Sequence, residues 1–141
     1  MNQLLAAALT LILGALLVIL PVKNTWRATF GLLSQTIATL LTWLAVVPVL
    51  AGGTAPYVEL PWGYPIGAVH FRLDALGAFF LSWSLPMTLL GAVYAVGYLR
   101  QYFDTPRHVG VHFGLLNMIS LSFLMVYTGE HAVTFLMGWE I

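Results

Sequence analysis

The chain has no cysteine and very little charge. Only 7% of its 141 residues are Asp, Glu, Lys or Arg, whereas 60% are hydrophobic; soluble domains carry about 25% charged residues. Without cysteine, the chain can form neither disulfides nor thiolate metal sites. Five basic and five acidic residues cancel, so nucleic-acid binding has no electrostatic support. The composition therefore predicts an integral membrane protein.

The start of the chain does not predict a cleavable secretory signal. Met1-Asn2-Gln3 carries no basic residue, and the apolar stretch that follows ends without a small-residue cleavage site. We therefore expect this stretch to be retained as the first membrane helix.

Five hydrophobic stretches follow one another, and the fifth stops half-way. They cover residues 3–22, 28–50, 75–99, 111–128 and 131–141. At about 1.5 Å per helical residue, the last would extend roughly 16 Å, about half of a hydrocarbon core that is about 30 Å thick. We predict one all-α membrane bundle over residues 1–141, with four transmembrane helices and the first half of a fifth. A helix that stops at this depth indicates the N-terminal part of a larger protein.

The only long connection, residues 51–73, predicts a short β-hairpin on the outer membrane surface. Glycines and prolines, beginning with the helix stop at Pro48, separate two short runs at 57–60 and 68–73. Asp74 then starts the third helix, where a carboxylate satisfies free amide groups and complements the helix dipole. Arg72 is expected to pair with Asp74 in an interfacial ion pair that contributes little to stability.

Basic residues in short turns predict the orientation. Lys23 and Arg27 lie in one turn, and Arg100 and Arg107 lie in another, whereas the opposite side has only Arg72. The positive-inside rule places both basic turns in the cytoplasm and the N-terminus outside.

Glu140 is the strongest candidate for function. Counted from the polar corner at 129–131, it lies about 14 Å along the fifth helix, close to the bilayer midplane. A carboxyl group at that depth costs several kcal/mol unless it is partnered, hydrated or protonated. The functional interpretation is a carboxylate that binds and releases a proton beside a cation; the alternative is a glutamic acid kept neutral by burial. No basic residue of the chain reaches the same depth, so the counter-charge would come from elsewhere.

Weaker polar signals lie on other helices. Asn117 and Ser120, three apart on the fourth helix, would either hydrogen-bond a neighbouring helix, the better-supported role, or hold a water leading to Glu140. The polar residues at 34–36 are expected to pack against a neighbouring helix or lie near the headgroups.

Sites for metals and cofactors are not expected. His108 and His112 are four apart but lack a third ligand. The sequence contains no phosphate-binding glycine loop, nucleophile elbow, or haem or iron–sulfur spacing, so we expect no catalytic residue and no cofactor in this chain.

Three stretches together resemble one family. Residues 71–80, FRLDALGAFF, resemble the F-x-L-D-x-L-S-x-F-F start of the third helix in antiporter-like subunits, with Gly77 where a serine is common. Residues 97–99 are similar to the G-Y-[LM] at the inner end of that helix, and residues 135–140 to the F-x-x-x-W-E of the fifth helix. Such subunits occur in complex I, the Mrp antiporters and the group 4 hydrogenases. The sequence of residues 71–80 is most similar to that of hydrogenase-4 component B and the formate hydrogenlyase membrane subunits.

The resemblance covers residues 71–141, and residues 1–70 match in layout only. It implies a proton-translocating subunit of a bacterial or archaeal plasma-membrane redox complex, with other membrane subunits, lipid and protons as partners. The redox chemistry would lie in other subunits, and no redox site is implied here. Glu140 matches the family glutamate that pairs with a lysine on a later helix. The alternatives are a small non-catalytic assembly or packing subunit and an Mrp-type cation/proton antiporter subunit.

Overall fold

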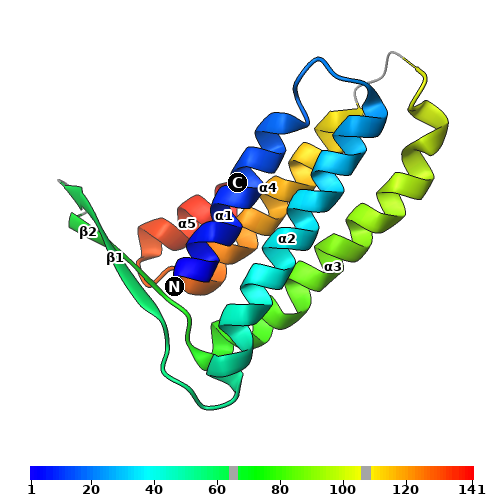
Figure 1. The fold of residues 1–141 in the computed structure, drawn as a ribbon. Coiled ribbons are helices and arrows are strands. Elements are labelled where there is room, and N and C mark those ends of the chain that lie inside the picture. Colours follow the sequence, from blue (N-terminus) through cyan, green and yellow to red (C-terminus); the bar gives the residue numbers. More distant parts are fainter. Residues whose placement is uncertain (64–66, 106–108) are drawn as a thin grey trace.

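The computed structural model describes residues 1–63, 67–105 and 109–141 (Figure 1). Over these ranges the chain is mostly helical, with one short hairpin. The elements are α1 (Asn2–Leu17), α2 (Asn24–Leu50), β1 (Tyr57–Gly63), β2 (Gly67–Arg72), α3 (Ala75–Leu99), the 3-10 turn η1 (Arg100–Tyr102), α4 (Val109–Thr128) and α5 (Ala132–Glu140). Figure 1 shows α1 to α4 side by side, with the hairpin projecting at the end of the bundle where α2 stops and α3 starts.

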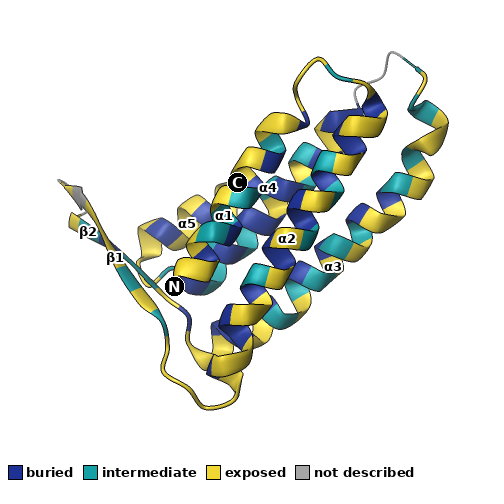
Figure 2. Ribbon diagram, viewed as in Figure 1, coloured by how far each residue is buried: buried dark blue, intermediate teal, exposed yellow. Residues whose placement is uncertain are grey.

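Three helices of the described residues are long and apolar enough to cross a membrane. They are Asn24–Leu50, Ala75–Tyr102 and Val109–Thr128. The apolar helix α1 has 16 residues, about 24 Å, and α5 has 9. Figure 2 shows that the outward faces of the helices are exposed around a buried interior, and these faces carry large hydrophobic side chains. Such a surface is suited to lipid rather than water.

The turn between α1 and α2 differs from the predicted one. We predicted a helix over 3–22, but α1 ends at Leu17, and the amides of Ile19 and Leu20 donate to carbonyls only three residues back, at 3.2 and 3.3 Å. Pro21 has no N–H and disfavours helical geometry at Leu20, so the chain turns there. The second helix was predicted over 28–50, yet α2 already starts at Asn24, within the predicted turn.

The other helix ends agree more closely. Pro48 was predicted to stop the second helix, but it lies inside α2, which continues to Leu50. A proline near the end of a helix removes only one internal hydrogen bond. The chain then turns at Gly52, whose φ of 86° favours glycine. Helix α3 has the predicted 75–99 bounds and remains one helix across Pro86, while α4 and α5 differ from 111–128 and 131–141 by one or two residues.

The predicted hairpin is confirmed. Strands β1 and β2 pair antiparallel, with Tyr57 opposite Arg72 and Val58 opposite Phe71. The hairpin is attached to the corner between α4 and α5, because Phe71 forms an isolated bridge with Gly129. The Glu130 amide also donates to the His70 carbonyl at 3.1 Å.

Asp74 and Arg72 have separate partners. The Asp74 side chain accepts a hydrogen bond of 2.7 Å from the Gly77 amide, which is the expected cap of α3. The expected pairing of Arg72 with Asp74 is wrong: Arg72 lies 2.7 Å from the Glu130 carboxylate. Because Asp74 is turned to its own helix, Arg72 pairs with the acid that the attached corner brings beside it.

The end with the 18–23 turn also carries the connection from α3 to α4. The Asn24 side chain donates to the carbonyls of Phe103 and Thr105, each at 3.3 Å. Lys23, Arg27 and Arg100 therefore lie at one end of the bundle, and Arg72 lies at the other. Arg107, which also supported the predicted orientation, is outside the described residues.

Candidate functional site

Glu140 is the last residue of α5, which packs against α4. The contact is close: the Ser122 hydroxyl donates to the Gly138 carbonyl at 2.6 Å. A Cβ added to Gly138 would lie 2.8 Å from Met125 and 3.1 Å from Val126. Figure 1 shows the C-terminus between the two ends of the bundle rather than at either of them.

The Glu140 side chain lies on the side of α5 that faces away from α4. Gly138 and Thr134 are buried, whereas Leu136 and Glu140, one turn apart, are exposed. Two helical residues correspond to about 200° of rotation, so Glu140 lies nearly opposite Gly138. Among residues 1–63, 67–105 and 109–141, no side chain forms a hydrogen bond or ion pair with its carboxylate. The arrangement is a carboxyl group on an apolar helix, open to whatever packs on that face.

A layer of buried polar side chains crosses the middle of the bundle. It consists of Ser34 and Gln35 on α2, Thr88 on α3, and Asn117 and Ser120 on α4, and we call it the polar layer. One apolar cluster, which includes Leu11, Val46 and Leu81, lies on one side of it, and another, which includes Val18, Ala92 and Phe113, lies on the other.

Hydrogen bonds join the polar layer in two groups. In the first, Asn117 Nδ2 donates to Ser34 Oγ at 2.8 Å. In the second, Gln35 Nε2 donates to Ser120 Oγ at 3.0 Å, and the Ser120 hydroxyl lies 3.0 Å from Gln35 Oε1 and 2.8 Å from Thr88 Oγ1. The Thr88 hydroxyl also donates to the Leu85 carbonyl of its own helix at 2.9 Å. Buried polar groups paired in this way hold helices together in an apolar medium.

Asn117 and Ser120 therefore belong to the polar layer and not to the surroundings of Glu140. Their hydrogen-bond partners described above are on α2 and α3, whereas Ser122 contacts α5. Ser122 follows Ser120 by two residues, about 200° round the helix, so the two serines point to different sides of α4. Of the two roles weighed for Asn117 and Ser120, the structure shows hydrogen bonds to neighbouring helices.

The close approach of α1 to this layer depends on a glycine. A Cβ on Gly14 would overlap the Cβ and Oγ of Ser34 and lie 2.5 Å from Asn117 Nδ2. Small residues at helix contacts allow this kind of backbone approach in membranes. Gly14 thus lets three helices meet at one point of the polar layer.

Two members of this region were not identified from the sequence. Thr88 follows Pro86 in a strongly apolar helix, and one threonine there gives no signal of its partners. Thr42, on α2, is fully buried, and its hydroxyl has no hydrogen-bond partner among the described residues. Since threonine is common in membrane helices, only the fold distinguishes these positions from others.

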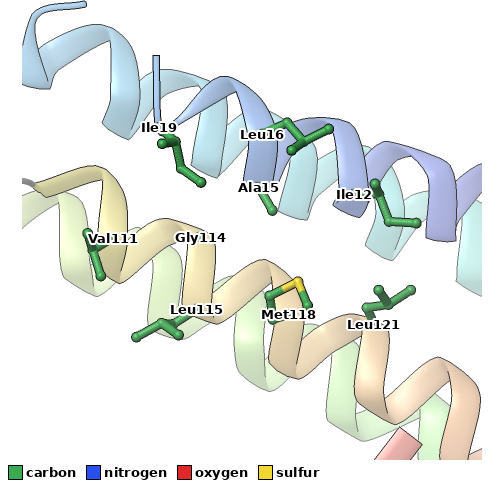
Figure 3. Close-up of a pocket in the computed structure, with 9 residues that line it drawn as sticks. All are labelled: Ile12, Ala15, Leu16, Ile19, Val111, Gly114, Leu115, Met118 and Leu121. Atoms are coloured by element: carbon green, nitrogen blue, oxygen red, sulfur yellow. The ribbon is translucent and has the colours of Figure 1, made fainter. Parts of the chain in front are cut away.

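A groove of about 370 Å³ lies between α1 and α4 (Figure 3). The nine residues labelled in that view are apolar or glycine, and they include Ile12, Leu16 and Met118. A lining without charge or hydrogen-bonding side chains offers no chemistry, so this groove is a packing surface. His108, of the weak histidine pair, lies outside the described residues.

The comparisons with known proteins show relatives but no function. No family model matches the chain. Uncharacterized proteins from two strains of Mycobacterium tuberculosis are 29% identical to it over 90 residues, which is 63% of this chain and 13% of each relative. The chain thus spans about 13% of the length of the curated relatives it matches.

Proposed function

We propose that the chain is the N-terminal portion of a proton-translocating, antiporter-like membrane subunit in a hydrogenase-4-like or complex I-like redox complex. One observation carries the proposal: Glu140 lies on an apolar helix, turned away from the bundle, with no partner for its carboxylate among the described residues. A carboxyl group in that setting is a functional candidate by default. The resemblance of residues 71–80 and 135–140 to the motifs of antiporter-like subunits supports the same function.

In this proposal, four helices span the membrane and α5 forms the first half of a fifth span. Helix α1 together with the apolar residues 18–20 would extend about 28 Å, close to the thickness of a hydrocarbon core. The N-terminus and the hairpin lie outside, and Lys23, Arg27 and Arg100 lie in the cytoplasm of a bacterial or archaeal cell.

The proposed role of Glu140 is to exchange a proton in response to a nearby cation. A positive charge close to the carboxyl group favours its ionised form, and withdrawal of that charge favours proton uptake. Because the basic residues Lys23, Arg27, Arg72 and Arg100 lie at the bundle ends, the cation comes from a later helix of the longer protein or from another subunit. The chain's own part is to hold α5, and with it the carboxyl group, against α4.

The test is Glu140→Gln in the full-length complex, reconstituted in vesicles. Protons translocated per electron are measured with a pH-sensitive dye, alongside the rate of electron transfer. We expect the ratio to fall in Glu140→Gln, because an amide cannot take up the proton. Glu130→Gln is the matched control, since this second glutamate pairs with Arg72 at the bundle end; it should leave the ratio unchanged.

Two outcomes of this experiment would favour one of the alternative functions. An unchanged ratio in Glu140→Gln would remove this residue from the mechanism and favour a packing subunit. Translocation that requires sodium would favour the Mrp-type antiporter.

A further inference from the structure

A polar depression of about 380 Å³ lies at the end of the bundle that carries the basic turn. Its lining includes Lys23 and Arg27 from the start of α2 and Asp104 from the connection that follows η1. It lies far from Glu140 along the chain and has no part in the proton exchange proposed above. Its charges suit a ligand that is itself charged.

Arg27 is a buried cation that has no acidic partner among the described residues. It is only 7% exposed, and its guanidinium donates to the Leu20 carbonyl at 2.9 Å and to the Asn24 side-chain oxygen at 2.9 Å. Both acceptors are neutral, and no carboxylate of the described chain lies within ion-pair distance of it. Buried charges are normally paired with a charge of opposite sign. The missing counter-charge is the first indication that an anion binds here.

The start of α2 gives a second indication. Lys23 is the N-cap residue, no side chain caps the helix, and its first turn contains no acid. The N-terminus of a helix favours negative charge, and orphan amides there bind phosphate groups. Lysine and arginine at this position add to the positive potential instead of offsetting it. The helix end and both side chains therefore favour the same kind of ligand.

An apolar groove continues from the depression along α2 and α3. It has a volume of about 190 Å³ and shares Thr25 and Phe103 with the depression, then runs past Ala28, Leu32 and Val96. An inorganic anion would make no use of this groove, whereas its apolar lining suits part of an acyl chain. A charged depression joined to an apolar groove matches a lipid with a phosphate headgroup.

We propose that this composite site binds one phospholipid. The phosphate lies at Arg27, Lys23 and the start of α2, and one acyl chain lies in the groove between α2 and α3. Asp104 lines the same depression and suits the ammonium of an ethanolamine headgroup, so phosphatidylethanolamine is the expected lipid. The proposal depends on α2 and α3 lying in a membrane but not on any role for Glu140.

The experiment is native mass spectrometry of the full-length protein, purified in detergent and freed of lipid. Phosphatidylethanolamine, phosphatidylglycerol and inorganic phosphate are titrated separately to obtain each Kd. The variants are Arg27→Gln, Lys23→Gln and Asp104→Asn. Arg100→Gln is the control, because Arg100 lies in η1 at the same end of the bundle but does not line the depression.

We expect one phosphatidylethanolamine per chain. Its Kd should rise about tenfold in Arg27→Gln, the loss of one charge-assisted hydrogen-bonding group. It should also rise in Lys23→Gln, whose exposed side chain can change without disturbing the fold, and stay unchanged in Arg100→Gln. Asp104→Asn should weaken phosphatidylethanolamine binding but not phosphatidylglycerol binding.

Three results would overturn the proposal. Equal weakening by Arg100→Gln would mean a non-specific lipid shell. Unchanged binding in both Arg27→Gln and Lys23→Gln would remove the site. Inorganic phosphate binding as tightly as the lipid would make it a free-phosphate site, with no role for the apolar groove.

Discussion

The hydrogen bonds between Gln35 and Ser120 should be measurable as a coupling between α2 and α4. Gln35 Nε2 donates to Ser120 Oγ at 3.0 Å, and the Ser120 hydroxyl, which has one proton, donates either to Gln35 Oε1 at 3.0 Å or to Thr88 Oγ1 at 2.8 Å. The pair therefore shares one or two bonds. Side-chain hydrogen bonds between membrane helices contribute about 0.6 kcal/mol on average, so we expect a coupling energy of roughly 0.6–1.2 kcal/mol.

The assay is a double-mutant cycle with Gln35→Leu, Ser120→Ala and the combination. The free energy of unfolding of each variant is measured in mixed micelles with increasing denaturing detergent. Thr36→Val, combined with Ser120→Ala, is the matched control, because the Thr36 hydroxyl donates to the Leu32 carbonyl of its own helix at 2.8 Å. Its coupling with Ser120 should be close to zero. A coupling for Gln35 that is no larger than this control would show that its hydrogen bonds with Ser120 do not stabilise the bundle.

Two further changes test the packing of α1 and the start of α3. Gly14→Ala should destabilise the protein by about 1–3 kcal/mol because the added Cβ overlaps Ser34. Gly97→Ala is the control: a Cβ there has nothing within 4 Å, so this change should be neutral or stabilising. Equal effects of the two changes on the thermal midpoint would refute the close contact at Gly14. Asp74→Ala should cost about 1 kcal/mol in detergent unfolding, and Asp74→Asn should cost much less, since an amide oxygen also caps; equal losses would mean that the cap is not what matters.

The long apolar stretches, and the glycines, prolines and polar residues between them, were sufficient to predict the order of the elements. Long apolar runs are helical in lipid because every backbone group must be satisfied within the segment. The bounds of α3 follow from Asp74 at its start and the polar residues after Leu99. The hairpin follows from the glycines and prolines of its loop, although its attachment to Gly129 depends on a contact that has no local signature.

The turn between α1 and α2 was predicted only in part, because the apolar composition of residues 18–20 favours helix whereas Pro21 disfavours helical geometry at Leu20. Residues 18–20 are apolar and read as helix. In the fold, the Leu20 carbonyl accepts from Arg27 instead of from a helical amide. Arg27 makes this interaction from the first turn of α2 rather than from the predicted connection.

The candidate site was predictable only in part. The depth of a residue in the membrane can be counted along its helix, but the direction in which its side chain points depends on the helices packed around it. Asn117 and Glu140 are both polar residues in apolar helices. Asn117 donates to Ser34, and two uncharged groups that each donate and accept can pair without any charge to balance. Their pairing across helices depends on the packing of α1 at Gly14, which the sequence does not reveal.

Glu140 differs from Asn117 in the kind of partner that its side chain needs, and the fold indicates on which face of α5 such a partner would lie. An ionised carboxylate only accepts hydrogen bonds, so pairing it requires donors or a cation that the apolar surface of α4 around Met125 and Val126 does not provide. The opposite face of α5 carries Leu136, 57% exposed, one turn before Glu140. In the proposed complex, the partner that balances the charge would therefore pack against that face. A cysteine at position 136 should cross-link to this partner in the assembled complex, whereas one at buried position 134 should not; cross-linking at both positions would mean that α5 is not held on α4 as the fold has it.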